Sequence, residues 1–246
     1  MDVGFKSDIG KRRETNQDAF MVYRPNKECG FFVVADGLGG HQAGEVASGL
    51  AVDMMKERLA SLGEEIRLDH FPVDEVRSWI EEINRMLIEE GDKDPHHKGM
   101  GTTFTMGCVL QTTLLIYHIG DSRLYRVREG LIEKVTNDHS LVEEMVRSGE
   151  LTEEQAVDHP QKNLLTRALG TDSQIEVDFQ RDSIRPSDVY FICSDGLSNF
   201  VSDQRLLSIA KEMDPQSAAE TKVEEANQNG GGDNITVVVF KPEVNI

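Results

Sequence analysis

Five acidic turns beside short apolar runs constrain the fold of this chain most strongly. The aspartates of these turns are Asp18, Asp36, Asp121, Asp195 and Asp233. In the last four turns a β-rich run adjoins the acid directly, as in FFVVADGLGGH (31–41) and GGGDNITVVVF (230–240). Such runs between glycine- or asparagine-containing turns are typical of strands. If these strands are neighbours in a sheet, their ends bring several carboxylates together.

Carboxylates that lie close together repel one another and cannot all stay ionised unless cations sit between them. Oxygen-only ligands select hard divalent ions such as Mg²⁺ and Mn²⁺. The acidic turns therefore predict a metal site first of all.

The order of apolar patterns predicts an α+β fold. Strands are expected at about 3–7, 19–24, 31–35, 102–110, 114–119, 124–128, 132–135, 175–181, 189–193 and 235–240. Apolar residues at helical spacing predict helices over about 43–59, 73–90, 203–212 and 216–227. Short turns between the central strands favour antiparallel pairing. Helix pairs inserted between distant strands indicate an α+β sandwich.

Composition narrows the function classes. The formal charge of −18 argues against binding to nucleic acid or anionic membranes, which requires basic patches. The sequence shows neither a leader pattern nor an apolar run of membrane-spanning length. Cys29, Cys108 and Cys193 are an odd number, which favours buried free thiols in a reducing cytoplasm.

Five motifs in a fixed order carry a family resemblance. RxxNQD, DGLGG, GDSR, SDGL and GDN, spread from residue 13 to residue 234, resemble the PPM/PP2C family of metal-dependent protein serine/threonine phosphatases, and its bacterial single-domain branch in particular. The likeness covers essentially the whole chain and implies a single domain over 1–246. It implies a four-layer α-β-β-α sandwich of two antiparallel sheets flanked by helices. The polar, irregularly helical segment at about 138–169 is the expected flap.

The resemblance also implies a ligand set. Asp36 would bridge two metal ions, and the carbonyl of Gly37 would bind one of them. Asp195 and Asp233 would complete the site of the first ion. Asp121, together with Asp195, would hold a weaker third ion. Read as an isolated turn, the GDS sequence around Asp121 instead indicates a hairpin.

Two further residues near the N-terminus receive roles from the resemblance. Arg13 is expected to hold phosphate oxygens, since a guanidinium suits them better than an ammonium. Without its motif, Arg13 would be one more surface arginine. Asp18 is expected to orient water at the metals rather than to bind an ion directly.

The general acid is the open point. Eukaryotic members of the family place a histidine directly after Asp-Gly, where this chain has Leu38. His41, three residues later, is the candidate for the general acid, and His139 at the start of the flap is the alternative. Loop histidines are commonly structural, and water at the metals can serve as the acid instead.

The predicted activity is Mg²⁺- or Mn²⁺-dependent hydrolysis of phosphoserine and phosphothreonine in proteins. The attacking water would be activated between two ions. The expected partners are phosphorylated proteins and a bacterial-type Ser/Thr kinase that opposes the enzyme, which itself is expected to be a monomer. Two alternatives stay open: an inactive binding module on the same fold, and a hydrolase of small phosphorylated metabolites.

Overall fold

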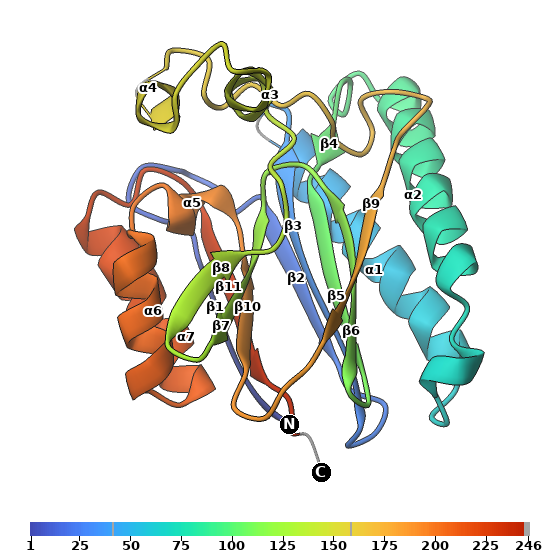
Figure 1. The fold of residues 1–246 in the computed structure, drawn as a ribbon. Helices are drawn as coiled ribbons and strands as arrows, with labels where there is room; N and C mark the ends of the chain where they lie inside the picture. Colours follow the sequence, from blue (N-terminus) through green and yellow to red (C-terminus); the bar gives the residue numbers. More distant parts are fainter. Residues whose placement is uncertain (41, 158, 244–246) are drawn as a thin grey trace.

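Two antiparallel β-sheets pack face to face, and helices cover the outer face of each sheet (Figure 1). The computed structural model describes residues 1–40, 42–157 and 159–243. This is the four-layer α-β-β-α sandwich expected from the sequence. Within the described residues, no helix is both long enough and apolar enough to cross a membrane.

Each sheet combines strands from both halves of the chain. The first sheet contains, in spatial order, β1 (Asp2–Asp8), β11 (Ile235–Lys241), β10 (Val189–Cys193), β7 (Arg123–Arg128) and β8 (Leu131–Lys134). The second contains β2 (Asp18–Tyr23), β3 (Cys29–Leu38), β5 (Phe104–Leu110), β6 (Thr113–Ile119) and β9 (Asp178–Ser183), with β4 (Gly101–Thr102) also paired to β3.

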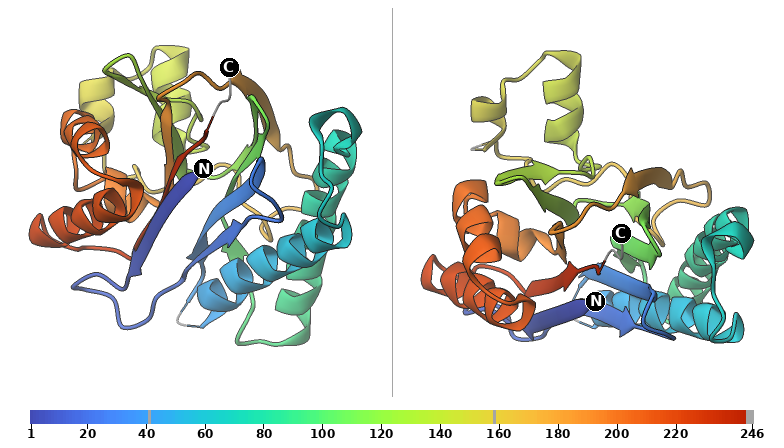
Figure 2. Two further views of the ribbon diagram at one scale, coloured as in Figure 1. Left: turned by 90° about the horizontal axis from the view of Figure 1, so that it is seen from below. Right: turned by 60° about the horizontal axis from the view of Figure 1, so that its bottom comes forward.

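The helices fall into three groups. The second sheet is covered by α1 (Ala43–Ser61) and α2 (Val73–Lys93), with a 3-10 turn at Leu68–His70 between them. The first sheet is covered by α5 (Asp195–Ser198), α6 (Asp203–Glu212) and α7 (Pro215–Gln228). The third group, α3 (Leu141–Ser148) and α4 (Glu153–Val157), stands apart from both helix layers at one end of the sandwich (Figures 1 and 2).

Strands buried on both faces explain the continuous apolar runs in the sequence. In β3, Phe32 and Val34 point between the sheets, whereas Phe31 and Val33 pack beneath the helices. Phe32 stacks on Phe240 of the opposite sheet with ring centroids 4.3 Å apart. Successive side chains alternate between two apolar environments, so neither face of β3 needs polar residues.

Antiparallel register brings the acidic turns to one end of the molecule. Asp18 at the start of β2 lies opposite Asp36 near the end of β3. Cys193, the last residue of β10, pairs with Arg123, the first residue of β7. Since β11 begins at Ile235, all five turns lie at the same end, below α3 and α4.

Several sequence expectations need correction. The single strand expected over 102–110 is interrupted at Thr103, whose backbone N–H donates to the Asp36 carbonyl (2.9 Å). β3 continues through Asp36 to Leu38, because Gly37 and Leu38 pair with β4. β9 starts at Asp178 rather than near residue 175, since its partner β6 ends one residue beyond the opposing His118.

The hairpin reading of the GDS sequence is wrong. β6 and β7, on either side of Asp121, belong to different sheets, so Gly120–Ser122 crosses from one sheet to the other. Gly120 has φ +109°, and a Cβ there would lie 2.5 Å from the Cβ of Thr103. Only glycine fits this crossing. The acid-bearing strands are therefore distributed over two sheets: β2 and β3 are neighbours in one, and β7, β10 and β11 are neighbours in the other.

Candidate metal and phosphate site

The structure brings all five predicted aspartates into one cluster, where the two sheets end together. Asp36 lies at its centre. Burial, followed by the negative charges of Asp18, Asp195, Asp121 and Asp233, raises the pKa of Asp36 well above its ordinary value. After burial, the four neighbouring carboxylates are the next causes of this rise, so like charges surround Asp36.

Asp18 is anchored through one oxygen only. Its Oδ2 accepts a hydrogen bond from the Ser194 hydroxyl (2.7 Å), while its Oδ1 is buried with no partner among the described residues. Burial raises the pKa of Asp18 to about 7, although the hydrogen bonds from Ser194 and Thr236 oppose the rise. The free oxygen is available to a further group at the site.

Asp195 and Asp121 show the same imbalance. Asp195, the first residue of α5 rather than part of an open turn, accepts a hydrogen bond from Asn199 at Oδ2 (3.0 Å), and its buried Oδ1 has no partner among the described residues. Burial and then the charge of Asp233 raise the pKa of Asp195 to about 6. Burial and then the charge of Asp195 raise the pKa of Asp121 to about 8.

Arg13 lies at the site, as predicted, and its position depends on Asp233. Its Nη2 donates to Asp233 Oδ2 at 2.7 Å, and the side chain is 49% exposed. The hydrogen bond to Asp233 is the main reason that the pKa of Arg13 is raised. A half-exposed guanidinium therefore stands beside the carboxylates with part of its surface open.

Asn234 holds the first motif against the last. Its Oδ1 accepts a hydrogen bond from the Gln17 amide (2.8 Å), and its Nδ2 donates to the carbonyls of Ile9 and Thr15 (2.9 Å each). The segment between Arg13 and Asp18 is thereby fixed to the turn that carries Asp233.

Hydroxyl side chains connect the acidic turns, and sequence reasoning missed them. Thr103 Oγ1 accepts a hydrogen bond from the Asp36 amide (2.9 Å) and contacts Ser122 Oγ (2.7 Å). Thr102 Oγ1 donates to the Asp36 carbonyl (2.9 Å). Ser194 likewise donates a hydrogen bond from its hydroxyl to Asp18. Their common signal is a Ser or Thr next to an acidic turn or at the start of the facing strand.

Gly37 is required by close packing of the backbone. Its N–H donates to the Gln17 carbonyl (3.0 Å), and a Cβ at this position would lie 2.1 Å from the carbonyl oxygen of Gly44. No side chain fits between β3 and the start of α1. This packing explains the glycine independently of any role for its carbonyl as a ligand.

Of the two histidines considered as the general acid, the structure describes one. His41 lies outside the described residues. His139 is buried beneath the Asp121 turn: its amide donates to the Gly120 carbonyl (2.7 Å), and its Nδ1 accepts from the Gly120 amide (3.1 Å). Its Nε2 lies 3.3 Å from Asp178 Oδ2. His139 therefore supports the turn and does not face the acidic cluster.

The donor set suits a hard divalent cation in its chemistry. It consists of carboxylate oxygens, two of which are buried without partners. Over residues 1–40, 42–157 and 159–243, however, no group of three or more His, Cys, Asp or Glu side chains is positioned to hold a metal ion. Arg13 engages Asp233 instead. Binding an ion would thus require the carboxylates to turn toward a common point.

Solved structures share this architecture. The serine/threonine phosphatase PstP/Ppp of Mycobacterium tuberculosis superimposes with a TM-score of 0.87 at 33% identity, over 96% of both chains. A PstP catalytic domain in complex with two manganese ions gives a TM-score of 0.83 at 33% identity, also over 96% of both chains.

The sequence comparisons agree. The model of the protein phosphatase 2C family matches residues 10–229, and the chain belongs to this family. The serine/threonine phosphatase stp of Listeria monocytogenes is 36% identical over 253 aligned residues, which cover 99% of this chain and 97% of the relative.

Proposed function

We propose that this chain hydrolyses phosphoserine and phosphothreonine in proteins, with Mg²⁺ or Mn²⁺ bound at the acidic end of the sandwich. The observation that carries the proposal is the buried excess of negative charge around Asp36, beside a half-exposed arginine. The manganese-bound PstP structure and the similarity to the serine/threonine phosphatase stp of Listeria monocytogenes support it.

Two ions would be held by the carboxylates of Asp36, Asp195 and Asp233 and by the Gly37 carbonyl. Asp121, with Asp195, would hold a weaker third ion, since one private carboxylate and one shared one make a poor site. When bound, the ions would supply positive charge for the phosphoryl group and an activated water for in-line attack.

The protein's own groups would orient the reactants. Arg13 uses one nitrogen to reach Asp233, so its other N–H groups remain for non-bridging phosphate oxygens. Asp18 is held by Ser194 at Oδ2, which leaves Oδ1 to accept a hydrogen bond from the attacking water and fix its direction.

For the general acid we keep His41 as the candidate, because His139 is occupied by the Asp121 turn. The test is His41→Ala assayed with aryl phosphates of good and poor leaving groups. Loss of a general acid slows the poor leaving group far more than the good one. Equal slowing of both would assign protonation to water.

The same proposal extends to the substrates, the oligomeric state and the cellular compartment. Substrates would be proteins phosphorylated by a bacterial-type Ser/Thr kinase, and the enzyme would act as a monomer. Three buried free cysteines fit a reducing compartment such as the cytoplasm. The net charge of −18 makes nucleic acid and anionic lipid poor partners.

Phosphopeptide hydrolysis with added Mn²⁺, with and without a chelator, tests the proposal. We expect phosphate release that the chelator stops and excess Mn²⁺ restores. Turnover of sugar phosphates at rates equal to those of phosphopeptides would favour the metabolite hydrolase instead. An absence of turnover on every substrate would favour the binding module, although the chain has an acid at each expected ligand position.

A further inference from the structure

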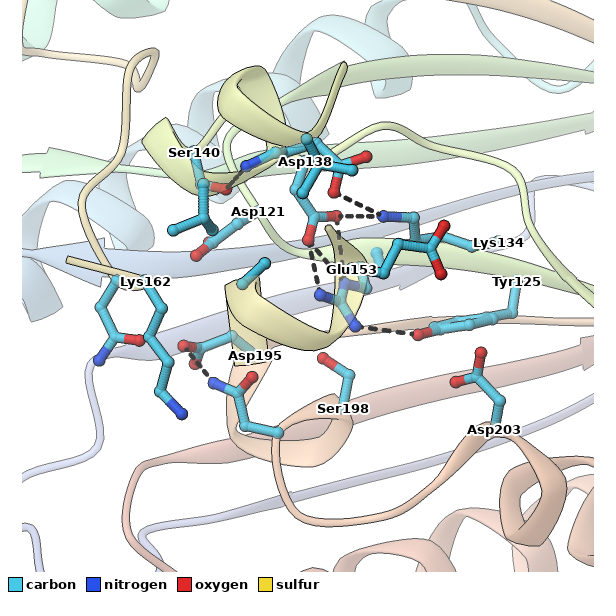
Figure 3. A pocket seen from close by; sticks show the side chains of 17 residues that line it. Asp121, Tyr125, Lys134, Asp138, Ser140, Glu153, Lys162, Asp195, Ser198 and Asp203 are labelled. Carbon is cyan, nitrogen blue, oxygen red and sulfur yellow. Dashed lines mark hydrogen bonds and ion pairs between the residues drawn. The ribbon is translucent and has the colours of Figure 1, made fainter. Parts of the chain in front are cut away.

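A pocket of about 520 Å³ extends from the acidic cluster to the flap, residues 138–169 (Figure 3). Asp121 and Asp195 line it on the side of the cluster. Residues of α3 and α4 form one wall, and residues of β7, α5 and α6 form the other. Its volume is in the range of pockets that bind small molecules, so an extended side chain fits inside it.

The lining of the pocket is predominantly acidic. Six carboxylates contribute to it: Asp121, Asp138, Glu143, Glu153, Asp195 and Asp203. The basic side chains are Arg123, Lys134 and Lys162. A ligand of positive charge therefore suits the pocket better than one of negative charge.

Arg123 and Lys134 contact acids of the same lining. Arg123 donates to both oxygens of Asp138 through Nε (3.1 and 2.9 Å) and reaches Oδ2 through Nη2 (2.6 Å). Lys134 Nζ lies 3.5 Å from Asp138 and 3.4 Å from Glu143. These contacts balance the negative charges of Asp138 and Glu143.

The outer end carries two acids from opposite walls. Glu153 belongs to α4 and Asp203 to α6; both are exposed, and neither has a hydrogen-bonded or ion-paired partner in the part of the chain that the structure describes. Ser198, on the same wall as Asp203, has a buried hydroxyl oxygen that also lacks a partner among those residues. These groups offer acceptors that no donor in residues 1–40, 42–157 and 159–243 uses.

Apolar side chains stand beside these acceptors. Val142 and Val146 of α3 and Ala156 of α4, all half-buried, line the pocket on the flap side. Arginine and lysine bury their aliphatic stems on apolar surface while their charged heads reach polar groups. The pocket provides both surfaces within one cavity.

We propose that this pocket is a subsite for an arginine or lysine side chain of the substrate, near the phosphorylated residue, with Glu153 and Asp203 receiving the positive charge. The inference rests on the proposed function, because that function places the phosphoryl group beside Asp121 and Asp195. It defines the preferred substrates as phosphoproteins with basic residues next to the phosphorylation site.

Three phosphopeptides that differ only at the flanking positions test the subsite. They carry arginine, glutamine or glutamate there, and kcat/KM is measured for each with Mn²⁺. We expect the arginine peptide to exceed the glutamine peptide by roughly three- to tenfold, the size expected for partly exposed charge pairs, and the glutamate peptide to be slowest. The preference should weaken at high salt.

The variants locate the preference. In Glu153→Gln/Asp203→Asn the ratio of arginine to glutamine peptide should fall to about one. Glu154→Gln is the matched control, because Glu154 is exposed on the same helix but does not line the pocket; it should retain the wild-type ratio. A ratio that survives in the double variant would overturn the proposal.

Other outcomes separate the subsite from the activity. If all three peptides are hydrolysed equally well by the wild type, the subsite is wrong and the phosphatase stands. If none is hydrolysed, both proposals are wrong. If the double variant needs more Mn²⁺ for all three peptides alike and the ratio is unchanged, the outer acids serve a cation and the subsite is overturned.

Discussion

Two groups of acids stand out among the described residues, and they differ in how far basic residues balance their charge. The acidic cluster of Asp18, Asp36, Asp121, Asp195 and Asp233 lies at one end of the sandwich. The second group, which we call the arginine-paired group, consists of Asp182, Asp188, Arg126, Arg128 and Tyr190 and lies toward the opposite end of β7 and β10.

The arginine-paired group satisfies its acids internally. Arg128 donates to both oxygens of Asp188 (2.9 and 2.6 Å), and Arg126 donates to Asp182 (2.7 Å). Burial opposes ionisation of Asp188, but the hydrogen bonds from Arg128 and from the Arg185 amide hold its pKa below the ordinary value. In the acidic cluster the pKa values of four acids move upward instead. Balanced acids hold the sheets together, and unbalanced acids create a place for a cation.

Asp36→Asn should have the largest effect on activity. Removing a charged ligand weakens the attraction for the ions, which contribute several kcal/mol to the reaction, so we expect phosphopeptide turnover at saturating Mn²⁺ to fall roughly 10²- to 10⁴-fold. Without metal the variant should melt at a higher temperature than the wild type, because one repelling charge is gone. Asp53→Asn, on the exposed face of α1, is the control. Near-normal turnover of Asp36→Asn would show that Asp36 is not a metal ligand.

Asp188→Ala should show the opposite pattern. It leaves Arg128 without its main partner, and breaking a buried ion pair costs about 3–5 kcal/mol of unfolding free energy. Urea denaturation measures this loss, while turnover per folded molecule should match the wild type because the acidic cluster is at the other end. A strong loss of turnover at unchanged stability would break the comparison between the two groups.

The pH dependence of stability should also differ in sign between the groups. The depressed pKa of Asp188 stabilises the folded state fully above the unfolded-state pKa of about 4, and this stabilisation is lost as pH falls from about 4 through the lower folded-state pKa. Asp18 and Asp121, raised to about 7 and about 8, hold protons in the folded state that the unfolded chain has released. Chelated protein should therefore lose stability as pH rises from about 4 to 8. Melting curves should show this fall with chelator and a much smaller one with Mn²⁺.

Arg13→Ala should have a moderate effect, since the guanidinium is half exposed and the phosphate would keep its other partners. A hydrogen bond to a charged group contributes about 1.5–3 kcal/mol, so kcat/KM for a phosphopeptide should fall roughly ten- to hundredfold, mainly through KM. Arg13→Lys keeps the charge without the planar fork and should recover only part of the loss. If kcat and KM are unchanged in Arg13→Ala, Arg13 is a surface residue without a role in phosphate binding.

Local patterns predicted the α+β class and the clustering of the acids, whereas the four-layer order was implied by the family resemblance. A continuous apolar run makes strands such as 31–35 recognisable, and the acids adjoin such strands. The sequence did not predict that Gly120–Ser122 crosses between sheets, since a Gly-Asp-Ser turn has the same local appearance in a hairpin and in a crossing. Contacts such as Thr103 with Ser122 and Ser194 with Asp18 join residues from different strands, so periodicity carries no signal for them.

His139 should show the smallest effect on activity. It lies at the same end of the molecule as the acidic cluster, but its contacts are with Gly120 and Asp178. His139→Leu leaves the Gly120 amide without its acceptor, which should cost about 1–3 kcal/mol of unfolding free energy. His139→Asn, whose side-chain oxygen can replace Nδ1 as the acceptor, should lose less. Both variants should slow aryl phosphates of good and poor leaving groups by the same small factor, because the imidazole supports the Asp121 turn and does not protonate the leaving group. A larger loss of rate for poor leaving groups than for good ones would identify His139 as the general acid.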